Sequence, residues 1–157
     1  MPKQNQEGQP HDTLELPPGV KLVRTLEGHK GVVWSVAFDW AGQMLATGGG
    51  DSAVNLWDVA SGRLLRTLKG HDGHVNSVAF DPVDQTLASG SRDGTVKLWK
   101  ETSRNLLCTL KGHKGPVNSV KFAPTGRTLA SGGSDNMVKL WDTISWELLR
   151  TLKGQWH

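Results

Sequence analysis

Short runs in which hydrophobic and polar residues alternate recur along the chain, and glycine-rich turns separate them. Residues 33–38, for example, read Val-Trp-Ser-Val-Ala-Phe, a brief run rich in β-branched and aromatic side chains. Alternation with a period of two predicts β-strands, and no segment offers a hydrophobic face with the period of a helix. The turns at 48–51 and 92–94 carry glycine and aspartate, which tolerate the positive φ angles of tight turns. The pattern predicts an all-β fold.

The same pattern occurs three times, in evenly spaced copies that begin at Gly28, Gly70 and Gly112. Each copy contains, in the same order, Gly-His, Val-x-Ser-Val-x-Phe, Leu-Ala-Ser/Thr-Gly and Val-x-Leu-Trp, and closes with Leu-Leu-x-Thr-Leu-Lys. Several motifs that share one period of about 42 residues without a gap indicate a repeat protein. We expect four strands in each copy, which in the first copy cover about 32–39, 43–48, 53–59 and 64–69.

These motifs resemble the WD-repeat β-propeller family, whose Gly-His and Trp-Asp dipeptides mark units of about 40–45 residues. The resemblance covers residues 22–153. It implies that the chain forms three four-stranded antiparallel blades within a repeat segment over 20–157. Proline, glycine and polar residues dominate positions 1–19, which predicts a flexible tail before that segment. The blades are expected at about 28–69, 70–111 and 112–153.

Two places depart from the family pattern. Lys100 follows Trp99 where the family has an aspartate, and residues 39–42 read Asp-Trp-Ala-Gly in place of a Pro-Asp-Gly-like turn. Neither lies in the part of a blade that the family resemblance implies to be buried. The predicted fold is therefore unchanged.

The resemblance also implies a hydrogen-bonded chain of a His, a Ser or Thr, an Asp and a Trp inside each blade. The chemistry is consistent, because an indole N–H only donates, a hydroxyl donates and accepts, and a carboxylate orients an imidazole. Such a chain buries polar groups with their hydrogen bonds satisfied. We expect it to be structural in preference to a metal or catalytic site. The matching sets are His29, Thr47, Asp51 and Trp57; His71, Ser89, Asp93 and Trp99; and His113, Ser131, Asp135 and Trp141.

Aspartate, histidine and serine together also occur in hydrolytic triads, so an enzyme is an alternative. A nucleophile needs a base within reach and an oxyanion site beside it. Here each hydroxyl lies in a predicted strand next to glycine and is repeated in every copy, whereas a catalytic site normally occurs once. No phosphate-binding loop, HExxH motif or nucleophile elbow occurs. We predict a protein without catalytic activity, metal or cofactor.

Composition and charge further limit the functional classes to which this protein can belong. The 157 residues suffice for one domain, with 36% hydrophobic and 21% charged residues. The net charge is only +3 and the basic residues are scattered, which argues against a nucleic-acid partner. Cys108 is the sole cysteine, so the chain forms no internal disulfide. Neither an apolar run of about 18 residues nor a signal peptide occurs, so we expect a cytoplasmic protein without membrane contact.

Three blades are too few to close a ring, because propellers typically have about four to eight blades and each blade is covered on both faces. Exposed apolar faces of that size mark an assembly surface. The chain is therefore expected either to complete the ring by self-association or to be a fragment of a larger propeller. Two chains would turn roughly 60° per blade and three roughly 40°, against about 45–51° in rings of eight or seven. A smaller ring loses less association entropy, but the angles favour a nine-bladed homotrimer over a six-bladed homodimer.

Residues 22–27 read Leu-Val-Arg-Thr-Leu-Glu and match the closing strand of a copy, as at 64–69 and 148–153. We therefore predict an extra outer strand over about 21–27, which makes thirteen strands as three sets of four plus one. In a ring of identical chains only one of 22–27 and 148–153 can pair at each junction, and an unpaired outer strand is an open edge. The direct run from 22–27 into His29 favours exchange of this strand between subunits.

In the WD-repeat family, partners usually bind the face around the channel entrance, through residues beside the first-strand bulge and just before the conserved aspartate. The resemblance implies that a protein or peptide partner binds there, with Trp34 as an aromatic anchor. These positions differ between the copies while the scaffold motifs stay constant, although neutral variation at a surface would give the same pattern. The corresponding residues are Val32, Trp34 and Gly50; His74, Asn76 and Arg92; and Pro116, Asn118 and Ser134.

The leading function that follows is a non-catalytic scaffold or protein-interaction module that assembles its own ring. One alternative is a multivalent small-ligand or glycan binder with one Trp34 site per subunit, which glycan or metabolite binding would distinguish. Another is a fragment of a larger propeller, which further in-phase repeats in the neighbouring coding sequence would favour.

Overall fold

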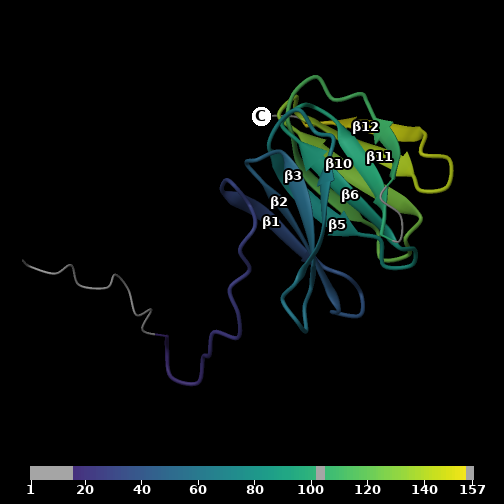
Figure 1. The fold of residues 1–157 in the computed structure, drawn as a ribbon. Helices are drawn as coiled ribbons and strands as arrows, with labels where there is room; N and C mark the ends of the chain where they lie inside the picture. The colour runs from purple at the N-terminus through teal and green to yellow at the C-terminus, as the bar shows by residue number, and fades with distance from the viewer. Residues whose placement is uncertain (1–15, 102–104, 155–157) are drawn as a thin grey trace, which may run out of the picture.

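The chain forms three four-stranded antiparallel sheets that lie side by side, each corresponding to one blade (Figure 1). This computed structural model describes residues 16–101 and 105–154, and within them every regular element is a strand. The all-β prediction and the three blades are therefore confirmed. The strands are β1 (Val33–Phe38), β2 (Met44–Gly49), β3 (Ala53–Asp58), β4 (Leu64–Lys69), β5 (Val75–Phe80), β6 (Thr86–Ser91), β7 (Val96–Lys100), β8 (Leu106–Leu110), β9 (Val117–Phe122), β10 (Thr128–Gly133), β11 (Met137–Asp142) and β12 (Leu148–Lys153).

Each blade is a meander in which consecutive strands are neighbours in the sheet. The first strands of the blades, β1, β5 and β9, contact one another in sequence, while β4, β8 and β12 form the outer edges. A bulge interrupts the pairing at the start of the first strand, between Val33 and Ser35 in the first blade. A second bulge lies in the pairing of the third strand with the outer strand, between Leu56 and Trp57. The predicted strands of the first copy agree with β1 to β4 to within about one residue.

The hydrophobic core consists of two clusters, and each is the contact between two adjacent blades. The side chains of one cluster have the same repeat positions as those of the other, shifted along the chain by one repeat. The first blade contributes Ala46, Val54, Leu56 and Leu68, and the second blade covers them with Val75, Val78, Leu87 and Trp99. The second blade in turn contributes Ala88, Val96, Leu98 and Leu110, which Val117, Val120, Leu129 and Trp141 of the third blade cover.

Close approach between the blades depends on a glycine in the second strand of each blade. A β-carbon at Gly90 would lie 2.7 Å from a methyl carbon of Val117, and one at Gly48 would lie 2.6 Å from a methyl carbon of Val75. The missing side chain thus leaves the space that the valine of the following blade fills. At Gly132, the corresponding position of the third blade, nothing lies within 4 Å.

A serine hydroxyl also links each blade to the next. The backbone N–H of Val78 donates to Ser35 Oγ at 3.1 Å, and that of Val120 donates to Ser77 Oγ at the same distance. The hydroxyls thereby satisfy backbone donors of β5 and β9, which are edge strands with a pairing partner on one side only. The sequence analysis did not single out these serines, although the repeated Val-x-Ser-Val motif contains them.

The predicted extra strand over 21–27 is absent from this structure. Residues 20–32 have no strand pairing, and the described residues form twelve strands instead of thirteen. The physical reason is that a strand needs a neighbouring edge: Arg24 and Gly28 place this segment against the first blade, and among the described residues no blade precedes the first to offer that edge. Of the predicted tail, residues 1–15 lie outside the described residues, and a turn closed by a bond from Val20 N–H to the Pro17 carbonyl follows them.

We predict that Gly90→Ala lowers the free energy of unfolding by about 1–3 kcal/mol, because the new methyl group would overlap Val117 and Val120 in the contact between blades. Urea denaturation followed by tryptophan fluorescence measures this effect. Gly42→Ala would test strain at a positive φ angle without any steric overlap, since nothing lies within 4 Å of that site. A Gly90→Ala protein as stable as the wild type would contradict the close contact described for this interface.

Candidate functional site

The four side chains of the set in the second blade form one continuous hydrogen-bonded chain. His71 Nδ1 lies 2.8 Å from Asp93 Oδ2, and His71 Nε2 lies 2.8 Å from Ser89 Oγ. The Trp99 indole N–H donates to the same hydroxyl at 2.8 Å. Strand pairing places these residues: Ser89 lies in β6 and Trp99 in β7, while His71 and Asp93 lie in the turns at one end of the blade.

The first and third blades contain the same arrangement. His29 Nε2 lies 2.7 Å from Thr47 Oγ1, which accepts the Trp57 N–H at 2.9 Å. In the third blade both corresponding distances, from Ser131 Oγ to His113 Nε2 and to Trp141 Nε1, are 2.9 Å. The remaining links join His29 to Asp51 at 3.0 Å and His113 to Asp135 at 2.9 Å.

One protonation pattern satisfies every group of this chain. A carboxylate only accepts, so the histidine carries its hydrogen on Nδ1 and donates it to the aspartate. Nε2 then accepts the hydroxyl hydrogen, and the hydroxyl oxygen accepts the indole N–H. The histidine side chains are 1–5% exposed, and among the described residues no buried polar side-chain atom lacks a hydrogen-bond partner. A neutral imidazole with its hydrogen on Nδ1 therefore satisfies both of its hydrogen-bond partners.

The second blade has the strongest electrostatic perturbation. Burial lowers the pKa of His71, and the hydrogen bond and charge of Asp93 act in the opposite direction without cancelling this effect. Burial would raise the pKa of Asp93, but hydrogen bonds from Thr95 and His71 outweigh it and lower this pKa to about 2. Thr95 Oγ1 donates to Asp93 Oδ1 at 2.7 Å, a contact that sequence reasoning missed. The corresponding positions in the other blades are Ala53 and Met137, which have no hydroxyl.

The aspartate of the Trp-Asp dipeptide lies outside the histidine sets and has a different structural role. Asp58 Oδ1 accepts the backbone N–H of Ser61 at 2.7 Å, and Asp142 Oδ1 accepts that of Ser145 at 2.8 Å. Each aspartate thus closes the turn that leads to the outer strand. In the second blade Lys100 instead forms an ion pair with Asp84 at 2.6 Å. The departure from the family pattern therefore replaces a contact within the turn to the outer strand by an ion pair between the end of β7 and the turn that joins β5 to β6.

The nine predicted partner-binding residues gather at the same end of the three blades as the histidines. In each blade the position before the conserved aspartate donates its backbone N–H to the carbonyl beside the first strand, in each case at 2.8 Å. Two side chains from this group bridge adjacent blades. Trp34 stacks on His74 with ring centroids 6.5 Å apart, and Asn76 Nδ2 donates to the Val117 carbonyl at 3.0 Å. The backbone bonds join Gly50 to Val32, Arg92 to His74, and Ser134 to Pro116.

The exposure of these residues is uneven. Trp34 is 55% exposed and Val32 61%, so a large apolar surface lies beside His74 at this end. Asn118 and Ser134 are exposed and bond to each other at 2.9 Å, whereas Asn76 and Pro116 are half-buried. The structure therefore groups the predicted residues into a band, defined here as the channel-face band, with Trp34 as its largest exposed side chain.

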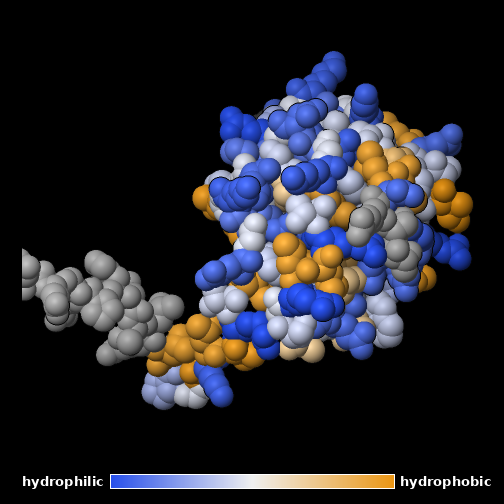
Figure 2. Space-filling model, viewed as in Figure 1, coloured by the Kyte–Doolittle hydropathy of each residue, from blue (hydrophilic) through white to orange (hydrophobic). Residues whose placement is uncertain are grey.

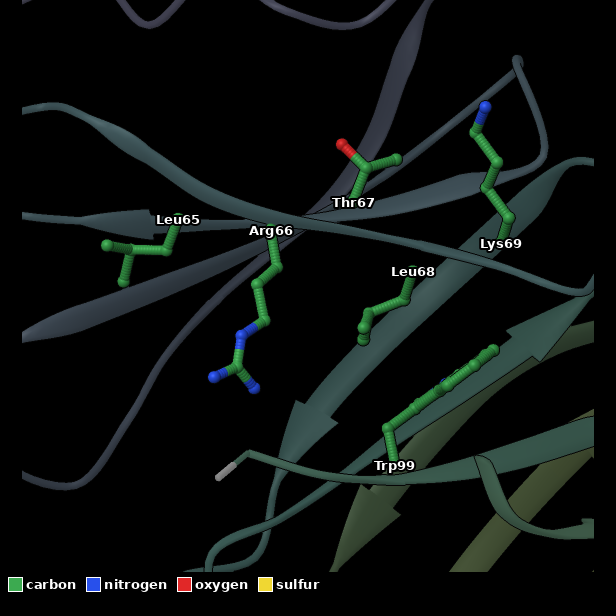
Figure 3. Close-up of a pocket in the computed structure, with 6 residues that line it drawn as sticks. All are labelled: Leu65, Arg66, Thr67, Leu68, Lys69 and Trp99. Atoms are coloured by element: carbon green, nitrogen blue, oxygen red, sulfur yellow. The ribbon is translucent and has the colours of Figure 1, made fainter. Parts of the chain in front are cut away.

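A groove lies elsewhere, between outer strand β4 of the first blade and Trp99 of the second (Figure 3). It has a volume of about 490 Å³, and Leu68 points from β4 toward the Trp99 ring. Arg66 extends from the same side of β4 and donates to the Glu101 carbonyl at 2.7 Å. No histidine, cysteine or carboxylate lines the groove among its described residues. Among residues 16–101 and 105–154, no cluster of three His, Cys, Asp or Glu side chains could hold a metal ion.

Comparison with known proteins agrees with this geometry. The chain matches the family described as "WD domain, G-beta repeat" over residues 20–58, 62–100 and 104–142, which together make up about three quarters of its length. The chain belongs to the WD-repeat family. Each family match starts two residues before an outer-strand sequence and ends at the last residue of the third strand that follows. The sequence repeat and the blade are therefore offset by one strand.

Several curated proteins are similar to short parts of this chain. Eukaryotic translation initiation factor 3 subunit I is 54% identical over 39 residues in Scheffersomyces stipitis and 56% identical over 39 residues in Lodderomyces elongisporus. Each of these alignments covers 25% of this chain and 11% of the relative. Ribosome biogenesis protein ERB1 of Yarrowia lipolytica is 39% identical over 54 residues, which is 34% of this chain and 6% of that protein. The matched segments thus span about a tenth or less of the relatives' length.

In the described part of the chain, no helix is long and apolar enough to cross a membrane.

We predict that Trp99→Phe lowers the free energy of unfolding by about 1–3 kcal/mol, because it removes the indole N–H that Ser89 accepts inside the WD-repeat blade. Thermal and urea denaturation measure the change. Trp40→Phe is the matched control, since Trp40 is 81% exposed and its replacement should leave stability unchanged. Equal stability of both variants would contradict a stabilising role for this hydrogen bond.

We predict that stability falls as the pH decreases below about 6.5, because the folded state holds His71 neutral while the unfolded chain takes up a proton there. A further loss is expected between about pH 4 and pH 2, where Asp93 is protonated in the unfolded state first. Urea midpoints at about pH 7.5 and about pH 5 test the first limb. His71→Gln should reduce this dependence, and an unchanged slope in that variant would argue against the assignment.

Proposed function

We propose that this WD-repeat chain is a non-catalytic interaction scaffold that assembles with copies of itself into a closed propeller, a nine-bladed homotrimer. The observation that carries the proposal is that the two end faces of the chain are the two halves of a contact that the chain already makes twice internally. The first blade lacks a blade before it, and the third lacks a blade after it. A second copy of the chain supplies the missing half at each end.

The face of β1 is the first of these halves. Val33 and Val36 correspond to Val75 and Val78, which are 0% and 1% exposed against the preceding blade. In β1 the same two side chains are 47% and 61% exposed, and Phe38 is 60% exposed. Identical residue types at identical strand positions are thus buried wherever a preceding blade exists. Burial of this face gives association a hydrophobic driving force.

The outward face of the third blade is the second half. Val138 and Leu152 are 41% and 45% exposed, whereas Val96 and Leu110 at the same positions of the second blade are 0% and 6% exposed. The empty space at Gly132 corresponds to the space that Val117 and Val120 fill beside Gly90. Ser119 corresponds to Ser77, whose hydroxyl accepts the valine N–H of the next blade. These residues form a complement to the β1 face of a second copy.

Ring size follows from the angle between blades. A trimer closes at roughly 40° per blade and a dimer at roughly 60°, and the smaller departure from common propellers supports the trimer. Each junction then repeats the contact found between blades within the chain, so that nine equivalent contacts close the ring. Head-to-tail association of this kind closes only if the rotation per subunit divides a full turn.

The repeated histidine sets support a structural role. Each hydroxyl that could serve as a nucleophile already bonds to both an imidazole and an indole N–H, and each histidine side chain is at most 5% exposed. A substrate carbonyl therefore cannot reach the hydroxyl oxygen of the serine or threonine, and a hydroxyl that no substrate reaches cannot act as a nucleophile. We infer that the three sets hold the turns of the blades in place.

The channel-face band is the proposed binding surface for a protein or peptide partner. Trp34 and Val32 of the first blade supply exposed apolar area, and Arg92 of the second blade and Asn118 and Ser134 of the third add exposed polar groups to the band. An aromatic anchor with a polar surround is typical of protein interaction sites. The names of the relatives, which include a subunit of a translation initiation factor, support a module of protein assemblies. A glycan on Trp34 is the second candidate, because the ring is exposed and stacked on His74.

Light scattering coupled to size exclusion tests the self-assembly. We expect a mass of three times the 17.1 kDa chain mass, and dilution should couple dissociation to unfolding. Val36→Asp and Gly132→Val each alter one half of the junction and should lower the association constant at least about tenfold. Val83→Asp is the control, since Val83 is 74% exposed outside either face. A folded wild-type monomer at micromolar concentration would overturn the proposal.

A further inference from the structure

We propose that the first blade binds a primary alkylammonium group in a pocket between β3 and β4. The pocket has a volume of about 270 Å³ and lies at the end of the blade where His29 bonds to Asp51. All of its lining residues belong to the first blade, so the site is independent of the proposed assembly. The lining includes Gly28, Lys30, Asp51, Asn55, Thr67 and Lys69.

The first blade has a short side chain where the other two blades have a lysine. Asn55 of β3 corresponds to Lys97 of β7 and Lys139 of β11. An asparagine side chain is shorter than a lysine side chain, so the first blade lacks the end of the chain and its ammonium group. In every blade this position faces a threonine of the outer strand: Asn55 pairs with Thr67, Lys97 with Thr109, and Lys139 with Thr151.

In the second and third blades the lysine ammonium group bonds to that threonine. Lys97 Nζ donates to Thr109 Oγ1 at 2.9 Å, and Lys139 Nζ donates to Thr151 Oγ1 at 3.0 Å. Lys139 is only 7% exposed, and the pocket that it lines in the third blade has a volume of about 150 Å³. The fold thus holds an ammonium group at this position in two of its three blades, and the larger pocket of the first blade has room for a third.

The side chains that line the first-blade pocket offer oxygen atoms to an ammonium group. Thr67 Oγ1 donates its hydrogen to Asn55 Oδ1 at 2.8 Å, so the hydroxyl lone pairs stay available to an incoming N–H. Asn55 is 1% exposed, and a hydrogen bond to a charged donor is strong in such surroundings. An ammonium group has three donors and no acceptor, which matches these oxygens. The Asn55 amide nitrogen would instead suit an anion, so acetate is the opposing probe in the experiment.

The charges around the pocket match those around the lysine of the third blade. Asp51 lies in the lining, as Asp135 lies in the lining beside Lys139. Lys30 and Lys69 add positive charge, but both are exposed and can extend into water. The third blade holds its ammonium group with lysine at both of these positions. The corresponding lysines of the third blade are Lys114 and Lys153.

Two acidic groups favour a cation at this site. Glu27, directly before the glycine that lines the pocket, stands where the third blade has Lys111. Burial would raise the pKa of Asp51, but hydrogen bonds from the Lys30 backbone N–H and from His29 outweigh it and hold this pKa below its ordinary value. The Asp51 carboxylate is therefore charged at neutral pH, where a primary amine is protonated.

The ammonium group has two possible sources, a free alkylamine and the lysine side chain of a partner protein. Hydrophilic residues cover much of the surface of the blades (Figure 2), so exposed charge alone does not distinguish this pocket. Its distinguishing feature is the lysine position occupied by Asn55. Asp51 in the lining directly follows Gly50 of the channel-face band, so a partner that contacts the band has a site for a lysine beside it.

Saturation-transfer NMR with n-butylammonium chloride at constant ionic strength tests the site. We expect signal transfer from the wild-type protein to n-butylammonium, and none to n-butanol, which has the same chain without the charge. Asn55→Lys restores the residue that the other blades carry and should abolish the transfer. Gln85→Lys adds the same charge in an exposed turn and should leave it unchanged. Equal transfer with wild type and Asn55→Lys, or binding of acetate in place of n-butylammonium, would overturn the proposal.

A second pair of variants tests the threonine contact. Thr67→Val removes the acceptor hydroxyl and should weaken n-butylammonium binding about tenfold. Thr109→Val removes the corresponding hydroxyl of the second blade, where Lys97 already occupies the place, and should leave the affinity unchanged. Circular dichroism shows that both variants are folded. An affinity unchanged in folded Thr67→Val would contradict the proposed contact.

A third ligand distinguishes the two sources of the ammonium group. Nα-acetyl-lysine methylamide carries the same amine on a peptide backbone. Binding of this compound at the pocket, with loss in Asn55→Lys, assigns the site to a lysine side chain of a partner. Binding of n-butylammonium alone assigns it to a free alkylamine.

Discussion

A four-stranded blade has two apolar faces, and the structure depends on both being covered by neighbouring blades. Val75, Val78, Val117 and Val120 are at most 1% exposed because each lies against the blade before it. Burying one such side chain contributes about 1.5–3 kcal/mol. The chain has no core apart from these contacts among its described residues, since both clusters lie between blades. Three blades in a row therefore leave one half of the contact unused at each end.

The polar groups are arranged so that this packing has a single register. Each histidine set ties the turn before a blade to its second and third strands, and the serine hydroxyl of one blade accepts a backbone N–H of the next. Buried polar groups that are fully satisfied specify one arrangement, because any shift would leave a donor without an acceptor. The order of the blades, which the polar bonds specify, and their close approach at Gly48 and Gly90 thus favour the same arrangement.

Variation between the copies falls where the repeated contacts do not require a particular residue. The histidine sets and the valines of the first strands are nearly invariant, while the channel-face band varies between the copies, apart from the asparagine shared by Asn76 and Asn118. The proposed functions follow this division: constant faces for association with identical copies, and a variable band for a different partner. Glu27 is a variation of another kind, since it changes a charge on a segment that otherwise repeats β12.

The repeat period and the four strands per copy could be predicted from the sequence, and the resemblance to the WD-repeat family implied the membership of each histidine set. Each depends on local patterns and on spacing within one repeat, where the neighbours of a residue are nearby in the chain. Other features came only from the tertiary structure: the stacking of Trp34 on His74, the partner of Arg24, the ion pair of Lys100 with Asp84, and the unpaired state of residues 20–27. These depend on which blade lies beside which edge. The sequence of 22–27 is that of a strand, but a strand forms only where a free edge receives it, and among the described residues no blade precedes the first one to offer that edge.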